Sequence, residues 1–227
     1  MAPAVKRSPR QVRKYDASRR QEQARQTQRA VIVAAQQLFI EQGYGRTTMA
    51  DVARAAGVSV ETVYANFRNK PTLLHRVWDI TIGGDDDDVV FHERPEVKAI
   101  RAEPDLAKRL ALHAKFSTQT QRRITPFLLA LQGAAASEPT AADMLDEIGR
   151  QRLAGLSVMA SEAAKTGQLA VSEEECRDIV WAFTDGTLWH RLVNERGWSD
   201  DRFADWLGQM WVAMLVKPRR TTPRRRS

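Results

Sequence analysis

Two short helical segments separated by only three residues constrain this sequence more than any other feature. The first segment covers residues 49–56: Thr48 before it is a residue type that begins helices, and Gly57 after it is a type that ends them. Ser59 is again a helix-starting residue, and it precedes a second segment that extends to about Phe67. The residues between the segments are too few for anything but a tight turn.

Longer helices flank this pair. Apolar residues recur at i, i+3, i+4, i+7 and i+8 from Val31 to Phe39, which predicts a helix that begins near Ser18 and ends at Gly43. A fourth helix, capped by Asn69, is predicted over residues 70–82. This order matches a helix-turn-helix unit, whose second short helix can enter the major groove of DNA. From spacing alone, an ordinary corner between two helices remains the alternative.

The rest of the chain also shows helical periodicity. Beyond an acidic run at 85–88 and a short helix that opens at Pro95, five more helices are predicted. Their expected ranges are 104–120, 123–137, 141–166, 173–196 and 200–216. No segment alternates β-branched residues in a strand pattern. We therefore predict an all-α fold, with an N-terminal three-helix helix-turn-helix domain and a larger C-terminal helical domain.

Charge is distributed unevenly along the 227 residues. Residues 1–80 carry 14 basic and six acidic side chains, residues 81–216 carry 15 and 22, and residues 217–227 carry six basic and no acidic ones. An acidic middle between two basic ends is expected of a protein that binds a polyphosphate with one end. Solvated tails on an ordinary protein are the alternative. We expect a flexible basic arm over 1–17 and a flexible basic tail over 217–227.

Several classes of protein are excluded by what the sequence lacks. Its single cysteine, Cys176, cannot close a disulfide within the chain, and no Cys/His cluster has metal-ligand spacing, so neither a metal nor another cofactor is expected. No apolar stretch approaches the roughly 20 residues of a membrane span. A glycine-rich phosphate loop, a nucleophile elbow and paired catalytic carboxylates are all missing. These observations predict a cytoplasmic protein that is not an enzyme and has no membrane partner.

The residue types between Arg29 and Val77 resemble the DNA-binding domain of the TetR (tetracycline-repressor) family of bacterial transcriptional regulators. The residues that carry the resemblance are Gly43-Tyr44, Thr47-Thr48-Met49, Asp51-Val52-Ala53, Ala56-Gly57-Val58-Ser59, Thr62-Val63-Tyr64, Phe67, Lys70 and Leu73-Leu74. The resemblance implies a DNA-binding domain with its connecting helix over 18–82 and an effector-binding and dimerisation domain over 83–216. It further implies a homodimeric repressor, associated with the nucleoid when bound, that a small and largely apolar ligand releases from a palindromic operator of double-stranded DNA.

Contacts with DNA follow from the resemblance position by position. Thr48 and Tyr64 correspond to hydroxyls that contact phosphates, Lys70 corresponds to an ammonium group that does the same, and Thr62 faces the same backbone. The base-reading positions are occupied by Val60, Glu61, Ala65 and Asn66. Glu61 has a second interpretation, because the helix dipole stabilises an anion in the first turn. The basic residues expected to extend the contact from the arm are Arg19, Arg20 and Arg25.

The C-terminal domain supplies candidates for the effector site and the dimer interface. The resemblance implies an apolar pocket with a few polar anchors, and the expected lining residues are Trp78, His113, Phe116, Gln119, Phe127, Leu131, Trp181, Asp185 and Trp189. The two last predicted helices are apolar over wide stripes, as interface helices are. The expected dimer residues are Leu188, Leu192, Phe203, Trp206, Met210, Trp211 and Met214.

Three functions of different kinds are consistent with this sequence. The first is the ligand-responsive repressor, and the second is an architectural DNA-binding protein or regulator without an effector. The third is a helical interaction module with basic ends. A defined operator would separate the first two from the third, and a small molecule that releases the operator would separate the first from the second.

Overall fold

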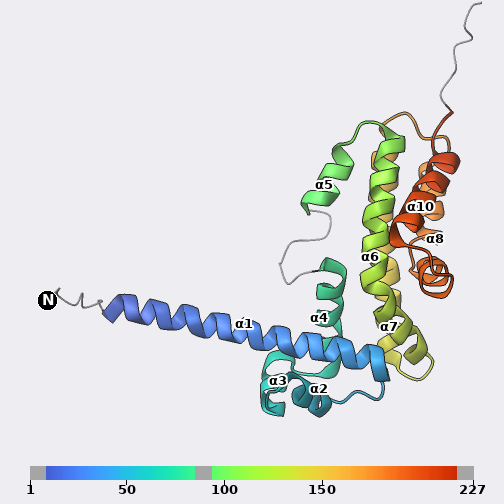
Figure 1. Ribbon diagram of the computed structural model, residues 1–227. Helices are drawn as coiled ribbons and strands as arrows, with labels where there is room; N and C mark the ends of the chain where they lie inside the picture. Colours follow the sequence, from blue (N-terminus) through green and yellow to red (C-terminus); the bar gives the residue numbers. More distant parts are fainter. Residues whose placement is uncertain (1–8, 85–93, 219–227) are drawn as a thin grey trace, which may run out of the picture. The chain divides into compact units, whose positions relative to one another are not determined.

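The computed structural model describes residues 9–84 and 94–218 (Figure 1). Within these ranges the regular structure is helical, apart from an isolated antiparallel bridge between Leu169 and Val216, so the predicted all-α fold is confirmed. The first eight residues of the predicted arm, the acidic run at 85–88 and the predicted tail beyond residue 218 lie outside the described residues. The chain divides into two compact units, one up to Asp79 and one from Ile80 onward.

The N-terminal unit contains four helices. They are α1 (Pro9–Gln42), α2 (Met49–Ala56), α3 (Val60–Phe67) and α4 (Lys70–Gly83), of which α4 continues past the boundary between the units. Its core is built from side chains that are at most 2% exposed: Val31, Ala35, Phe39, Val52, Ala53, Val63, Phe67, Leu73, Leu74 and Val77. Every one of the four helices contributes to this core, which fixes α2 and α3 against the longer helices.

Helix α1 begins at Pro9, nine residues before the predicted start, so residues 9–17 of the predicted flexible arm are helical. Figure 1 shows α1 as one continuous helix whose N-terminal half extends beyond α2 and α3. The sequence analysis began this helix near Ser18 because few apolar residues precede that position. Helix propensity explains the difference, since the stretch after Pro9 is rich in Arg, Gln and Ala and contains no glycine or further proline up to Gln42.

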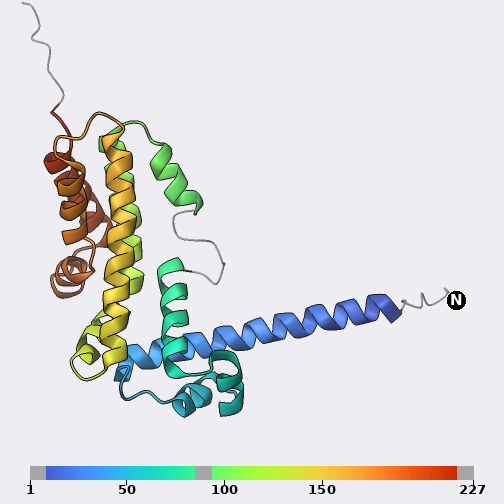
Figure 2. The same cartoon turned by 180° about the vertical axis from the view of Figure 1, so that it is seen from behind.

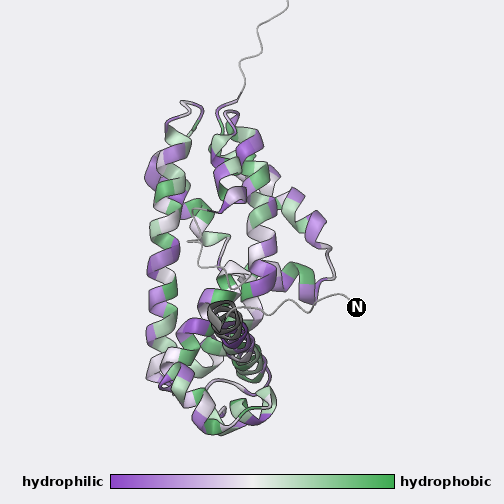
Figure 3. Cartoon of the chain, turned by 90° about the vertical axis from the view of Figure 1, so that its left-hand side faces the viewer, coloured by the Kyte–Doolittle hydropathy of each residue, from purple (hydrophilic) through white to green (hydrophobic). Residues whose placement is uncertain are grey.

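The C-terminal unit is built around the long helix α6 (Leu106–Ala135). The other helices are α5 (Pro95–Ala102), α7 (Pro139–Ala164), α8 (Glu173–Ala182), α9 (Thr187–Trp189) with a π-helical continuation over His190–Glu195, and α10 (Asp200–Leu215). Helix α6 contacts α5, α7, α9 and α10, and Figure 2 shows α6 and α7 side by side. Hydrophilic and hydrophobic residues alternate around the long helices (Figure 3), as expected for helices with one buried face.

Two predicted boundaries in this unit are wrong. The predicted helices 104–120 and 123–137 form a single helix, α6. Its buried stripe continues through Gln121, Ile124 and Leu128, and packing outweighs the helix-breaking tendency of Pro126. Conversely, the predicted helix 173–196 is interrupted after Ala182. Gly186 there has a φ of 87°, and the Asp185 carboxylate accepts hydrogen bonds from the N–H and hydroxyl groups of Thr187, so a new helix begins.

Several residues predicted for the dimer or effector surfaces belong to the core of this unit. Phe203 and Trp211 have no exposed surface, and Trp189 is 5% exposed with its indole N–H donating to Asp200 Oδ1 at 2.9 Å. These three side chains therefore fill the interior and are not available to a partner on the surface. Within the described ranges, no helix combines the length and the apolar character needed to cross a bilayer.

Candidate nucleic-acid interface

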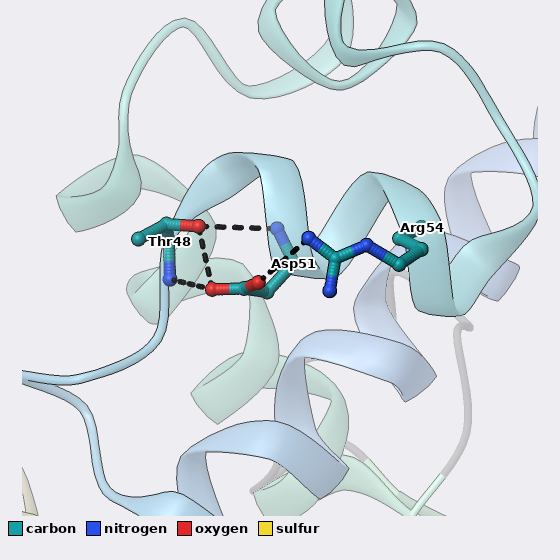
Figure 4. Close-up of polar contacts among 3 residues, drawn as sticks. All are labelled: Thr48, Asp51 and Arg54. Atoms are coloured by element: carbon teal, nitrogen blue, oxygen red, sulfur yellow. Dashed lines mark hydrogen bonds and ion pairs between the residues drawn. The ribbon is translucent and has the colours of Figure 1, made fainter.

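Helix α2 begins with a complete capping box at Thr48 and Asp51 (Figure 4). The Thr48 hydroxyl oxygen accepts the Asp51 N–H at 3.1 Å, and the Thr48 N–H donates to Asp51 Oδ2 at 3.0 Å. Arg54, one turn later, places a guanidinium nitrogen 3.1 Å from Asp51 Oδ1. The sequence predicted the Thr48 cap but assigned no capping role to Asp51, although the Thr-x-x-Asp spacing is a signal for one.

The turn between α2 and α3 is fixed at both ends. Gly57 adopts a left-handed conformation with φ 68°, which a glycine adopts without strain, and the next N–H, that of Val58, donates to the Ala53 carbonyl at 3.0 Å. Ser59 then caps α3 by accepting the Thr62 N–H at 3.2 Å. The tight turn predicted from the three intervening residues is confirmed.

Helix α3 buries one face and exposes the other. Val63 and Phe67 are buried in the N-terminal core, whereas Tyr64, Ala65 and Asn66 are exposed, with Tyr64 retaining 50% of its surface. The helix is only eight residues long, so its orientation depends on these buried anchors rather than on its own hydrogen bonds. Helix α3 is therefore anchored by its buried face, and its outward side chains do not pack in the core.

Two predicted base-reading residues have local partners. The Asn66 side-chain N–H donates to the Thr62 carbonyl at 2.7 Å, one turn back on the same helix. Glu61 is exposed, and hydrogen bonds from its own backbone N–H and from the Ser59 hydroxyl lower the pKa of its carboxyl group. These contacts favour the second interpretation of Glu61, an anion stabilised in the first turn of the helix. Val60 and Thr62 are half-buried at the start of the helix.

Lys70 lies in the first turn of α4, as predicted, and is held in place by two contacts. Its Nζ atom is 4.1 Å from the centre of the Tyr44 ring and donates to the Gly45 carbonyl at 3.3 Å. Asn69 caps the same helix by accepting the Thr72 N–H at 2.8 Å. The positive charge of Lys70 is therefore fixed beside the backbone N–H groups of a helix start, which is a suitable environment for a phosphate.

The predicted arm residues Arg19, Arg20 and Arg25 are exposed on α1, and Arg25 forms an ion pair with Glu22 one turn earlier. Sequence reasoning assigned no structural role to Thr47. This threonine is 1% exposed, and its hydroxyl lies 3.0 Å from the Gly43 carbonyl oxygen and 3.3 Å from that of Leu38. It joins the end of α1 to the start of α2, so the loop that carries Thr48 is held by a buried hydrogen bond.

Replacing Thr48 with alanine should destabilise the N-terminal unit by about 1 kcal/mol at pH 7, the usual cost of losing a helix cap. Hydrogen bonds from the Thr48 hydroxyl and N–H lower the pKa of Asp51, so ionised Asp51 adds stability above its unfolded pKa, and this is lost as pH falls through the folded value. The difference between the two proteins should therefore shrink at pH 3. Urea unfolding followed by circular dichroism at both pH values measures it, and an equal difference at both would contradict the capping box.

The predicted effector residues differ in burial and in their described contacts. Trp78 is buried in the N-terminal unit, whereas Gln119 is exposed. His113 packs edge-on against Trp211, and burial lowers its pKa to about 4, so it is neutral near pH 7. Phe116 is half-buried, and Phe127 and Leu131 are completely buried.

Trp181 and Asp185 do come together, around Arg152. The Arg152 guanidinium lies over the Trp181 ring, 4.6 Å from its centre, and donates to the Trp181 carbonyl at 2.7 Å. Burial lowers the pKa of Arg152, and the negative charge of Asp185 opposes this change. Trp181 is still 41% exposed, so this arrangement lies at the surface of the unit.

Two short helices, a glycine turn, capped starts and an outward-facing second helix define a helix-turn-helix domain. Residues 31–77 match the family model described as bacterial regulatory proteins, tetR family. The helix-turn-helix domain of this chain is therefore similar to the DNA-binding domain of the TetR family. It is 39% identical over 61 residues to the HTH-type transcriptional regulator TtgR of Pseudomonas putida and 29% identical over 65 residues to AcrR of Shigella flexneri. These matches cover 27% and 29% of this chain, and the chain spans only 29% and 30% of the length of those relatives.

Similarity of the whole fold extends further than similarity of sequence. NalD, the secondary repressor of the MexAB-OprM multidrug efflux pump in Pseudomonas aeruginosa, aligns over 84% of this chain and 97% of its own, with a TM-score of 0.60 and 20% identity. SmeT in its triclosan complex aligns over 87% of this chain and 95% of its own, with a TM-score of 0.63 and 20% identity. At this level of identity, the similarity establishes the fold alone.

Proposed function

We propose that the chain is a homodimeric transcriptional repressor that binds a near-palindromic DNA operator and is released by a small, largely apolar ligand. One observation carries the proposal: α3 exposes Tyr64, Ala65 and Asn66 while Val63 and Phe67 anchor it in the core. A helix mounted in this way can enter the major groove. The names of TtgR and AcrR as HTH-type transcriptional regulators support the same function.

Phosphate contacts would position α3 on the duplex. Thr48 and Tyr64 are exposed hydroxyls, Lys70 is an ammonium group at a helix start, and Thr62 lies on the adjacent turn. Such contacts fix the register of a protein on DNA without reading its sequence. The exposed arginines of α1 would add further phosphate contacts and would steepen the salt dependence of binding.

Base reading would fall mainly to the exposed face of α3. Asn66 can form two hydrogen bonds with an adenine edge, and Val60 or Ala65 can contact a thymine methyl group. Asn66 must first release the Thr62 carbonyl, to which its amide now donates. Glu61 can accept from a cytosine amino group only by leaving its capping hydrogen bonds. We therefore assign Asn66 the larger share of sequence discrimination.

A dimer would place two copies of α3 in successive major grooves, about 34–36 Å apart on one face of the duplex. Of the residues predicted for the interface, Leu188, Leu192, Trp206, Met210 and Met214 keep part of their surface exposed. Ligand binding in the C-terminal unit would favour an arrangement in which the two copies of α3 no longer fit this spacing. Such a protein would act on the nucleoid in the bacterial cytoplasm.

Asn66→Ala should change which DNA sequence is preferred while leaving non-specific affinity nearly unchanged. A bidentate contact with the correct base contributes about 1–3 kcal/mol of discrimination, equivalent to roughly 5- to 150-fold, and alanine cannot form it. Competition of single-base variants of the selected operator measures the effect. If base preference stayed the same in the variant, Asn66 would have no part in readout.

The decisive experiment is selection of bound sequences from random duplex DNA by the purified full chain at near-physiological salt. An enriched palindrome with fixed half-site spacing would support a dimeric, sequence-specific regulator and would provide the probe for effector screening. Salt-sensitive binding without sequence preference would favour an architectural protein. Absence of binding would contradict both DNA-binding functions and favour the interaction module.

A further inference from the structure

A row of polar side chains lies inside the C-terminal unit along one face of α6. Ser117, Gln121 and Thr125 are four residues apart, and Thr118 is three residues before Gln121, which places them on one side of the helix. Gln121 and Thr125 are each 1% exposed, and the other two are below 8%. Ala114 and Leu128, also buried, extend the same face at either end. Buried polar residues at consecutive turns of a helix are unusual and require hydrogen-bond partners.

Both threonine hydroxyls of this row already donate their protons to carbonyl oxygens of α6. Thr118 donates its hydroxyl proton to the Ala114 carbonyl at 2.8 Å, and Thr125 donates to the Gln121 carbonyl at 2.6 Å. The Gln121 amide nitrogen donates to the Ser117 hydroxyl at 3.3 Å. The Gln121 side-chain carbonyl oxygen, Oε1, is buried and accepts from no donor in the described part of the chain. A buried acceptor of this kind favours any molecule that brings it a donor.

The connection between α8 and α9 lies directly against this row. An added Cβ at Gly186 would be 2.4 Å from Thr125 Oγ1, so the backbone of the connection contacts α6 there. Arg152 also contacts the connection, because it donates to the Thr184 hydroxyl at 3.2 Å, and the negative charge of Asp185 acts on its guanidinium. The connection between Ala182 and Thr187 is not helical.

We propose that this row on α6 is a binding site for a small, largely apolar molecule that directs one hydroxyl or N–H donor at Gln121 Oε1. The side chains of the row are neutral, and the buried atom without a partner, Gln121 Oε1, is an acceptor, so this position favours a donor over an anion. Apolar neighbours on the same helix face would surround the rest of the molecule. The biological use of the site rests on the proposed ligand-released repression, but binding itself does not.

Phenol and fluorobenzene are suitable probes, because they are similar in shape and only phenol has a donor. Their affinities for the wild-type chain and for Gln121→Leu are measured by ligand-observed NMR titration. The ratio of the fluorobenzene Kd to the phenol Kd should be at least about fivefold higher in the wild type, since leucine removes the acceptor. Gln121→Met serves as a second variant of similar volume in case leucine disturbs folding.

Gln119→Leu is the matched control, because Gln119 lies two residues earlier on α6 and is exposed. It should leave the ratio at the wild-type value. An equal ratio in the wild type and both Gln121 variants would overturn the proposal, as would failure of both probes to bind the wild type. All of these measurements use the protein without DNA. Failure here would therefore leave the DNA-binding proposal standing, and failure of the DNA selection would leave this site standing.

Discussion

Gly186→Ala is expected to destabilise the C-terminal unit by about 2–5 kcal/mol. Gly186 has a φ of 87°, a conformation that costs an alanine roughly 1–2 kcal/mol. The added methyl group would also lie 2.4 Å from Thr125 Oγ1, and overpacking of this kind typically costs about 1–3 kcal/mol more. Urea unfolding followed by tryptophan fluorescence measures the loss.

Gly197→Ala separates the two contributions. Gly197 also has a positive φ, 70°, but an added Cβ there meets nothing within 4 Å. This variant should lose only the roughly 1–2 kcal/mol of backbone strain. Combining Gly186→Ala with Thr125→Ala should recover part of the larger loss, because the hydroxyl that causes the clash is removed. Equal losses in the two glycine variants would show that the α8–α9 connection does not press against α6.

The helix-turn-helix domain could be predicted closely from its sequence because its signals are local. Thr48, Gly57 and Ser59 each act within one turn of chain, through a side-chain cap or a left-handed backbone. The start of α1 was missed for the opposite reason. No packing requires residues 9–17 to be helical, so only propensity indicated their structure.

The C-terminal unit was predicted less well because its structure depends on contacts between distant segments. Pro126 taken alone indicates a break in the helix. Helix α6 nevertheless continues, because neighbouring helices bury its apolar stripe both before and after Pro126. Phe203 and Trp211 are aromatic residues of the kind that interfaces favour, but both are buried in the core of the unit. Periodicity shows that a face is apolar, but it does not show whether that face meets the same chain or a partner.

The buried acceptor of Gln121 could not be predicted from the sequence either. The sequence analysis named the exposed Gln119, and not Gln121, as a residue of the effector site. The two glutamines differ by two positions, or about 200° around a helix, so an error in the assumed face exchanges buried for exposed. Whether a buried amide has a partner depends on the rotamers of its neighbours, and these follow from tertiary packing.

Lys70→Ala is expected to weaken binding to the selected operator by at least about 100-fold at low salt. A hydrogen bond to a charged group contributes roughly 1.5–3 kcal/mol, and a dimer would lose two such contacts with phosphate. The slope of log affinity against log salt should also become shallower by about 1.8, because two phosphates are no longer neutralised. Fluorescence anisotropy at several salt concentrations measures both quantities. Lys115→Ala, a matched loss of one exposed lysine from α6, should change neither by a comparable amount.

The salt slope distinguishes a phosphate contact from a structural role for Lys70. Its ammonium group also contacts the Tyr44 ring and the Gly45 carbonyl, so alanine at this position could weaken binding simply by loosening the loop before Thr48. Loosening would lower affinity at every salt concentration by the same factor, which leaves the slope unchanged. A shallower slope together with an unchanged melting temperature would therefore assign the ammonium charge to the DNA backbone. A lower melting temperature with the original slope would assign it to the loop instead.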